Sequence, residues 1–165
     1  MSSVKTAGRQ ALIDEADRAL RKMSSQGTLF GHAVAQALGI RPSDLESLDI
    51  IQLHGSVTAG QLATATGLTR GAITGLVDRL EAAGFLVRKP DAEDRRKVNI
   101  ELHPAAFSRV FPLYASLHAR MQENWEGFSD RQIKVILEFA TRSHRILAEE
   151  TTALSGGAAT PQDPR

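Results

Sequence analysis

The sequence contains no cysteine, and this absence excludes several classes of protein. Disulfide-stabilised scaffolds, zinc sites built from thiolates and redox sensors that use a thiol all depend on cysteine. Structural disulfides are typical of proteins exported to oxidising compartments, so we expect a chain without them to be cytoplasmic.

The sequence also lacks a long hydrophobic run. A membrane-spanning helix requires roughly 18 or more consecutive apolar residues, and no window of the chain approaches that length. Residues 1–20 have no apolar core of the kind found in signal peptides. We therefore expect no membrane partner.

Charge of one sign is not in excess. The 20 Lys and Arg residues face 19 Asp and Glu residues, which gives a formal net charge of +1. Net charge therefore neither indicates nor excludes a nucleic-acid partner, and any basic surface must be local. With 165 residues and 42% hydrophobic content, the chain can form one compact domain, or one domain with an extension.

No group of residues in the sequence is typical of catalysis or of metal binding. The five histidines lie far apart, and none has a neighbour at metal-ligand spacing. No set of serine, histidine and acid can be assembled from the pattern. We therefore expect no enzymatic activity, no metal and no cofactor. His103, directly before Pro104, is expected to begin a helix.

Helical periodicity predicts two amphipathic helices before residue 41. Residues 9–24 and 28–38 each place apolar side chains at helical spacing, and Gly27 separates the two segments. Gly39 is expected to end the second helix. Both segments are more apolar than a lone surface helix needs.

The next helix is predicted over residues 41–55. Ser43 is followed three residues later by Glu46, which is the spacing of a capping box and indicates Ser43 as the N-cap. Gly55 is expected to close this helix.

Two further helices follow in close succession. A short one begins at Thr58 and stops at Gly67, and a longer one begins with Thr69 as its N-cap and runs to Gly84. Two helices joined by so short a connection form a helix-turn-helix. The exposed side chains of the second helix that could contact DNA are those of Thr69, Arg70, Thr74 and Arg79.

The segments "FLVRK" and "KVNIEL" alternate polar and apolar residues, which predicts a β-hairpin after the second helix. Pro90 and Asp91 provide the turn, but the adjacent Arg95 and Arg96 are not needed for turn chemistry. Such a charge run is usually a solvated face, whereas in the wing of a winged helix a tip arginine reaches the minor groove or its phosphates. A nearby carboxylate can aim that guanidinium through a bidentate pair.

Helical periodicity returns at Pro104 and, after Ser129, in a last helix to residue 150. The composition of residues 151–165 predicts a disordered tail. The fold class is therefore mainly α with a small β-hairpin: a winged helix-turn-helix flanked by N- and C-terminal helices. The expected parts are N-terminal helices over 1–40, the winged domain over 41–103, C-terminal helices over 104–150 and the tail over 151–165.

The segment "GQLATATGLTRGAITGLVDRLEAAGFLVRKPDAEDRRKVNIEL" resembles the MarR family of bacterial transcriptional regulators, above all in "LVDRLEAAGFLVR" and "DAEDRR". The resemblance implies a repressor that binds a pseudo-palindrome in double-stranded DNA. It also implies a homodimer formed by the N- and C-terminal helices, which agrees with their surplus apolar surface. A small aromatic or phenolic effector would release the DNA.

The resemblance also implies individual roles. Thr69, Arg70 and Thr74 match the recognition-helix contacts of the family. Asp94 matches the wing aspartate that orients an arginine, and Arg96 matches the arginine placed in or near the minor groove, with Arg95 as the second choice.

Two glycines depart from the family pattern. Gly71 and Gly75 stand where relatives commonly carry serine and a larger, often basic, residue. Gly75 removes a possible base or phosphate contact, so contact with DNA would rely more on close approach of the backbone and on the wing. Together with the near-zero net charge, this leaves an alternative function: a winged helix that binds a protein partner without specific DNA binding.

Overall fold

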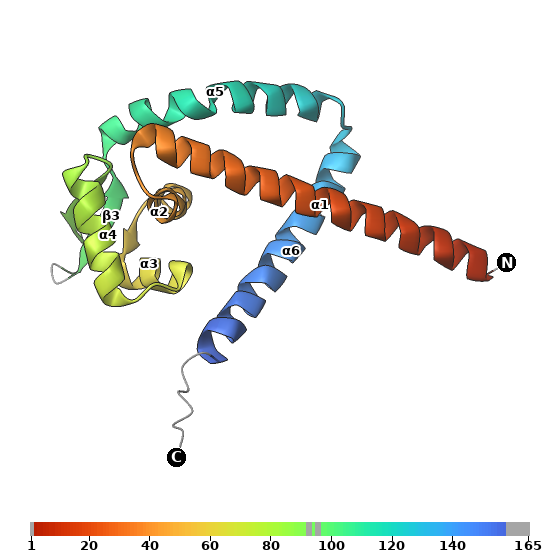
Figure 1. Ribbon diagram of the computed structural model, residues 1–165, viewed down its shortest axis with the longest axis horizontal. Helices are drawn as coiled ribbons and strands as arrows, with labels where there is room; N and C mark the ends of the chain where they lie inside the picture. The colour runs from red at the N-terminus through yellow and green to blue at the C-terminus, as the bar shows by residue number, and fades with distance from the viewer. Residues whose placement is uncertain (1, 92–93, 95–96, 158–165) are drawn as a thin grey trace, which may run out of the picture. The chain divides into compact units, whose positions relative to one another are not determined.

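The computed structural model describes the backbone of residues 2–91, 94 and 97–157, and the side chains of those that lie between residues 8 and 154 (Figure 1). The chain divides into two compact units, residues 1–110 and 111–165. The elements in chain order are α1 (Ser2–Leu38), α2 (Pro42–His54), β1 (Val57–Thr58), α3 (Ala59–Thr66), α4 (Arg70–Ala82), β2 (Leu86–Pro90), β3 (Val98–Leu102), α5 (Pro104–Glu126) and α6 (Asp130–Gly157). The expected fold class, mainly helical with a winged helix-turn-helix, is confirmed.

The segment before residue 41 is one continuous helix, α1, so the expectation of two helices was wrong. Gly27 lies inside α1, and a Cβ atom added there would meet no other atom within 4 Å. A glycine in a helix interior costs only about 1 kcal/mol relative to alanine. Gly39, at φ +70°, follows the end of the helix as predicted.

Helix α2 begins at Pro42, so Ser43 is not its N-cap. Arg41 occupies the N-cap position in extended conformation, and its N–H donates to the Asp44 carboxylate over 3.3 Å. Proline suits the first helical position because its missing N–H would have no helical acceptor there. The predicted pair of Ser43 and Glu46 is thereby replaced by Arg41 and Asp44.

The helix-turn-helix consists of α3 and α4, and both predicted N-caps are confirmed. Thr58 Oγ1 accepts the N–H of Gln61 over 3.2 Å, and Thr69 Oγ1 accepts the N–H of Ala72 over 3.3 Å. Gly67 ends α3 in the left-handed region at φ +71°, which glycine adopts without steric cost. The two helices are therefore delimited by local chemistry that the sequence carries.

The predicted hairpin is present as β2 and β3, which pair antiparallel with Leu86 opposite Leu102. A third strand, β1, pairs with β3 through Val57 opposite Ile100. The sequence did not indicate β1, because a strand of two residues has no alternation to detect. The sheet order β1-β3-β2 joins the hairpin to the residues that lead directly into α3.

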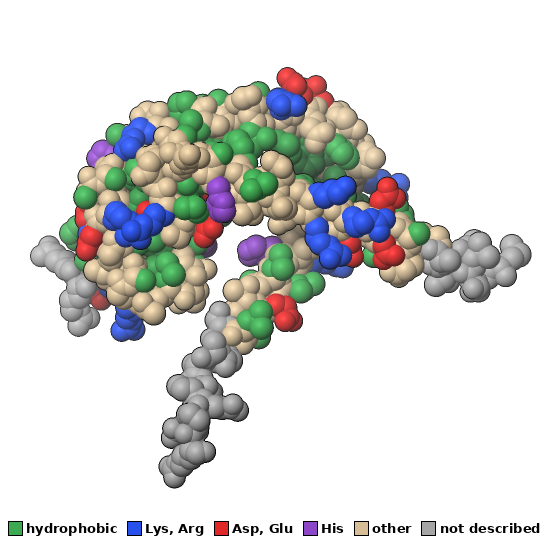
Figure 2. Space-filling model, viewed as in Figure 1, with side chains coloured by type: hydrophobic (Ala, Val, Ile, Leu, Met, Phe, Trp, Pro, Cys, Tyr) green, Lys and Arg blue, Asp and Glu red, His purple; other side chains and the backbone are tan. Residues whose placement is uncertain are grey.

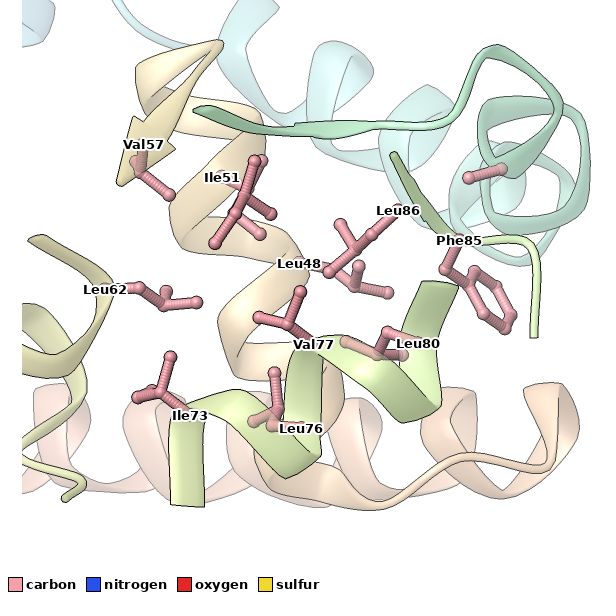
Figure 3. Close-up of a cluster of buried hydrophobic side chains, with 12 residues drawn as sticks. Leu48, Ile51, Val57, Leu62, Ile73, Leu76, Val77, Leu80, Phe85 and Leu86 are labelled. Carbon is pink, nitrogen blue, oxygen red and sulfur yellow. The ribbon is translucent and has the colours of Figure 1, made fainter. Parts of the chain in front are cut away.

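The core of the first unit gathers side chains of α2, α3 and α4 and of the sheet (Figure 3). Burial of a large apolar side chain contributes about 1.5–3 kcal/mol. This cluster therefore holds the helix-turn-helix and the base of the wing together. Its members are Leu48, Ile51, Val57, Leu62, Ile73, Leu76, Val77, Leu80, Phe85, Leu86, Ile100 and Ala106.

The start of α5 is fixed to the end of α4. His103 begins α5 as predicted, since its Nδ1 accepts the N–H of Ala105 over 3.1 Å. The guanidinium of Arg109 lies 3.9 Å from the ring centroid of the buried Phe85 and donates to the carbonyl of Ala83 over 2.7 Å. A cation at these last carbonyls of α4 is also favoured by the helix dipole.

The second unit contains the later part of α5 and all of α6. The Ser129 N–H and hydroxyl both donate to Gln132 Oε1, over 2.9 and 2.7 Å, at the start of α6. Many large apolar side chains of this unit are exposed in the single chain, among them Phe139 and Leu147. In the part of the chain that the structure describes, no helix is long and apolar enough to cross a membrane.

The predicted disordered tail is wrong for residues 151–157, which continue α6 to Gly157. The hydroxyls of Thr151 and Thr152 donate to the carbonyls of Leu147 and Ala148 over 2.7 and 2.9 Å. These bonds occupy hydroxyls that could otherwise compete for the helical backbone. Residues 158–165 lie outside the described residues.

A buried carboxylate joins α2 to α4. Asp44 is 1% exposed, and its oxygens accept from Arg79 Nη2 over 2.6 Å and from Arg79 Nε over 3.2 Å. The Arg79 side chain is 40% exposed, so the pair lies at the edge of the core. Hydrogen bonding to Asp44 raises the pKa of Arg79 against a smaller opposing effect of burial, and the guanidinium stays charged. The same carboxylate also accepts the N–H of Arg41, so one side chain both begins α2 and holds α4.

Replacing Arg79 with methionine should lower the free energy of unfolding by about 1–3 kcal/mol, because a buried acceptor loses its charged donor. Urea denaturation followed by circular dichroism measures the change. The control Arg142→Met removes an exposed i,i+4 partner of Glu138 on α6 and should change the free energy by less than about 0.5 kcal/mol. Adding Asp44→Asn to Arg79→Met should recover part of the loss. An Arg79→Met variant as stable as the parent would contradict this role.

Candidate nucleic-acid interface

Helix α4 has one buried and one exposed face. The buried stripe consists of Ile73, Leu76, Val77 and Leu80, which pack into the core. Helical spacing therefore turns the intervening residues outward. The exposed positions of the first two turns are Arg70, Gly71, Ala72, Thr74 and Gly75.

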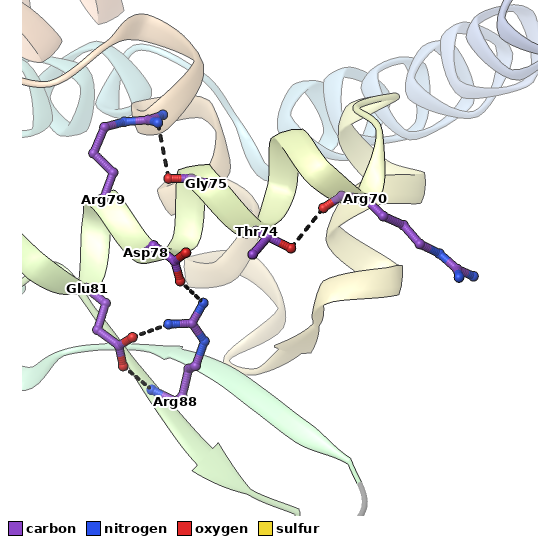
Figure 4. Close-up of polar contacts among 7 residues, drawn as sticks. All are labelled: Arg70, Thr74, Gly75, Asp78, Arg79, Glu81 and Arg88. Atoms are coloured by element: carbon purple, nitrogen blue, oxygen red, sulfur yellow. Dashed lines mark hydrogen bonds and ion pairs between the residues drawn. The ribbon is translucent and has the colours of Figure 1, made fainter.

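The structure brings Thr69, Arg70 and Thr74 together at the start of α4, as predicted from their spacing. The Arg70 side chain extends away from the helix (Figure 4), and no hydrogen-bond or ion-pair partner of its guanidinium is recorded among the described residues. Thr74 Oγ1 donates to the Arg70 carbonyl over 3.0 Å and keeps its lone pairs as acceptors. Thr69 Oγ1 accepts its capping bond and keeps its hydroxyl as a donor. Within the described part of the chain, this end of α4 therefore offers the guanidinium of Arg70 without a partner, with the hydroxyls of Thr69 and Thr74 beside it.

Arg79 lies apart from this group. Its guanidinium contacts Asp44 and donates to the carbonyl of Gly75 over 3.1 Å (Figure 4). The structure thus gives Arg79 a partner within the fold, and its contact with DNA stays a prediction. Sequence reasoning missed this pair because Asp44 and Arg79 are 35 residues apart.

The glycines of α4 leave its backbone accessible. A Cβ atom added at Gly71 or at Gly75 would meet no atom of the described residues within 4 Å. Neither glycine has a positive φ. The fold therefore requires glycine at neither position, although each costs about 0.5–1 kcal/mol relative to alanine in a helix interior.

An open hollow of about 780 Å³ lies next to Arg70, formed by the end of α2, β1 and α3. Its lining includes the polar side chains of His54, Ser56, Thr58, Gln61 and Thr64. Hydroxyls and amides of this kind commonly contact phosphate oxygens in protein–DNA complexes. Sequence reasoning did not single out this surface. The run of hydroxyl residues from Ser56 to Thr64 was the available signal.

The turn of the wing is organised by Asp91. Its carboxylate accepts the N–H of Asp94 and the side-chain amide of Asn99, each over 2.9 Å. The Asp91 N–H donates to the carbonyl of Lys97 over 3.0 Å. Asp91 therefore serves the turn as predicted. Arg95 and Arg96 lie outside the described residues, and the orienting role of Asp94 stays a prediction.

A second ionic group joins α4 to the wing. Arg88 of β2 donates to Asp78 Oδ1 over 2.5 Å and to Glu81 Oε2, and its backbone N–H donates to Glu81 Oε1 over 3.3 Å (Figure 4). Burial lowers the pKa of Arg88, but the hydrogen bonds to both carboxylates outweigh that effect and raise it. Sequence reasoning missed this group. The available signal was the position of Arg88 two residues after the buried Leu86, on the core-facing side of its strand.

On the face drawn in Figure 2, Asp and Glu side chains lie next to Lys and Arg side chains. This agrees with the net charge of +1 and with a basic surface that is local. Among the described residues, no cluster of three or more His, Asp or Glu side chains could hold a metal ion. Among the described residues, the start of α4 offers hydrogen-bonding groups and the exposed guanidinium of Arg70.

Comparison with known proteins identifies the family to which the chain belongs. A sequence profile of the MarR family matches residues 38–97. The uncharacterized HTH-type transcriptional regulator YcgE of Bacillus subtilis (strain 168) is 36% identical over 146 residues, which cover 88% of this chain and 95% of that protein. The HTH-type transcriptional repressor YetL of the same strain is 32% identical over 72 residues, or 44% of this chain and 43% of that protein.

Among solved structures, a MarR family protein from Bacillus stearothermophilus matches the fold with a TM-score of 0.62 at 22% identity, covering 84% of this chain and 96% of that chain. Regulators of the family bind DNA and function as dimers. These findings support DNA binding over the alternative of a winged helix that binds only a protein partner. The profile match over the helix-turn-helix and wing, together with a relative 36% identical along most of the chain, shows that this chain belongs to the MarR family of DNA-binding transcriptional regulators.

Proposed function

We propose that the protein is a homodimeric repressor that binds a pseudo-palindromic operator and is released by a small aromatic effector. The observation that carries the DNA-binding part is the exposed start of α4, where Arg70 extends from the helix beside the hydroxyls of Thr69 and Thr74. Such side chains at the N-terminal end of a recognition helix reach base edges in the major groove. The protein acts in the cytoplasm as a regulator and not as an enzyme.

The exposed apolar side chains support a dimer. Both units carry many of them, far more than the scattered apolar residues of an ordinary monomer surface. A two-fold dimer buries the same surface of both copies. The set includes Leu12, Ile13, Met23 and Leu29 on α1, Phe111, Leu117 and Met121 on α5, and Val135, Ile136, Leu137, Phe139, Ile146 and Leu147 on α6.

The proposed contacts divide by groove. Thr69, Arg70 and Thr74 face the major groove, and the hollow beside Arg70 lies against the phosphates. The wing reaches the adjacent minor groove with Arg96, or with Arg95 as the second choice, and Asp94 orients the guanidinium. Arg79 contributes by fixing α4 against Asp44.

The direction of regulation is supported by the name of YetL, a transcriptional repressor that matches over 72 residues. The proposal of a small aromatic effector rests on the resemblance to the MarR family. An effector can release the repressor from DNA only to the extent that it binds the DNA-free protein more tightly than the DNA-bound protein.

A footprint on the DNA upstream of the gene tests the function. We expect two protected half-sites about one helical turn, or roughly 34 Å, apart, since each subunit presents one recognition helix. Gel-shift affinity should fall steeply between two salt concentrations because phosphate contacts release counterions. Light scattering should give twice the mass of the chain. Absence of a shift at low salt would contradict DNA binding, and a monomer at micromolar concentration would contradict the dimer.

Arg70→Ala should weaken operator binding by about 1–3 kcal/mol if the guanidinium reads a guanine, or lower the salt slope by about one if it contacts a phosphate. Fluorescence anisotropy at several salt concentrations distinguishes the two results. Arg142→Ala removes the same charge from α6 and serves as the matched control. Equal affinities and salt slopes for Arg70→Ala and the control would contradict a contact between Arg70 and DNA.

Gly75→Ala should raise the free energy of unfolding by about 0.5–1 kcal/mol, because alanine is the better helix former. It should also weaken operator binding by about 1 kcal/mol or more, roughly fivefold, since the added methyl group blocks close approach of the backbone to DNA. Gly27→Ala in α1 is the matched control, because its Cβ also meets nothing within 4 Å. The control should gain stability without losing affinity. A Gly75→Ala variant with parental affinity would contradict close backbone approach.

A further inference from the structure

The recognition helix and the wing are connected by one guanidinium. Arg88 lies on β2 and bonds Asp78 and Glu81, which are three residues apart on one side of α4 (Figure 4). The backbone N–H of Arg88 also donates to Glu81, so both ends of this residue are held by the same carboxylate. The contact therefore constrains the position of the strand as well as that of a side chain.

The apolar packing beside this contact is incomplete. A cleft of about 150 Å³ separates part of α4 from the sheet, and its lining includes Val77, Val98 and Arg88. Val98, at the tip end of β3, is 47% exposed. The buried core holds the base of the wing through Leu86 and Ile100. Arg88 lies opposite Ile100 in the strand register, so its ionic contact adds to the packing at the outermost buried residue of the hairpin.

Exposed ion pairs usually contribute little to stability, so Arg88 could be a solvated charge without consequence. Three observations argue against that reading. The Arg88 side chain is two-thirds covered, it bonds two carboxylates at once, and its backbone shares one of them. Multiple bonds to a planar guanidinium fix geometry in a way that a single exposed pair does not.

The charges matter because DNA is a polyanion. Arg88, Asp78 and Glu81 together carry a formal charge of −1, and the Asp78 side chain is 61% exposed on α4. Without Arg88 the same surface would carry −2 beside the positions that face DNA. Arg88 can act through its charge, by reducing repulsion between these carboxylates and the phosphates of DNA. It can also act through geometry, by holding the wing at a fixed position relative to the helix.

We propose that Arg88 is a positioning residue that holds the wing at a fixed orientation to the recognition helix. The two elements then bind neighbouring grooves of DNA as one rigid unit. The role of Arg88 in docking rests on the proposed function, whereas its role in holding the wing does not. Asp78 and Glu81 act as the anchor on α4 and do not read bases. Geometry, more than charge, carries the effect.

Two variants separate geometry from charge. Arg88→Gln removes the contact and changes the local formal charge from −1 to −2. Adding Asp78→Asn restores −1 without restoring the contact. We expect operator affinity to fall about tenfold in Arg88→Gln, which corresponds to 1.4 kcal/mol. The double variant should stay weakened. Recovery of full affinity in the double variant would overturn the geometric role in favour of charge alone.

Footprinting the major and minor grooves separately distinguishes misplacement of the wing from a general loss of stability. A general loss would reduce protection in both grooves alike. Hydroxyl-radical cleavage should show lost protection in the minor groove flanking each half-site, while methylation protection in the major groove persists. Lys89→Gln is the matched control, because Lys89 is the next residue of β2 and pairs with Glu101 of β3 over 2.7 Å without reaching α4. The control should keep both protections. Parallel loss of both protections in Arg88→Gln would assign Arg88 a merely structural role.

Amide hydrogen exchange tests the contact without DNA. We expect faster exchange across β2 and β3 in Arg88→Gln than in the parent or in Lys89→Gln, with unchanged exchange in the buried part of α4. Unchanged exchange in the strands would overturn the proposal. If the parent protein fails to bind its upstream DNA while exchange still accelerates, the proposed operator fails and the Arg88 contact stands.

Discussion

The burial of one stripe of α4 is the constraint on which the rest of the structure depends. Ile73, Leu76, Val77 and Leu80 pack against α2, α3 and the sheet, and a helix that buries this stripe must expose the residues between. Rotation of α4 by a fraction of a turn would bury Arg70 and Thr74 and expose apolar side chains. The hydrophobic core thus determines which side chains of α4 are exposed, and these are the side chains that we propose face DNA.

Two arginine–carboxylate contacts then refine the position of α4 from opposite directions. Asp44 holds the helix to α2 through Arg79, and Arg88 holds the wing to the helix through Asp78 and Glu81. The first is built on a buried carboxylate and matters to stability. The second is more exposed and lies where packing leaves a cleft, so it bears mainly on orientation. The proposed contact with two grooves requires both, because the distance between helix and wing must then match the spacing of the grooves in DNA.

Stability and recognition conflict at the glycines of α4. Nothing in the surrounding fold requires Gly71 or Gly75, and each weakens the helix. In a helix whose exposed face meets DNA, the missing Cβ atoms allow the backbone to approach closely. The exposed apolar faces of α1, α5 and α6 reflect a similar relation, since they are unfavourable in a single chain and favourable once a second copy covers them.

The sequence by itself determined the features that depend on near neighbours. The threonine caps of α3 and α4, the glycines that follow α1 and α3, the alternation of the hairpin and the exposed positions of α4 all follow from spacing within a few residues. Local pattern failed where a cost was small or a signal short, as at Gly27, at Ser43 and in the two residues of β1. The tertiary structure alone decided the partners of Arg79 and Arg88. Charged side chains pair with whatever the packing of distant elements brings near, and chain spacing carries no record of that choice.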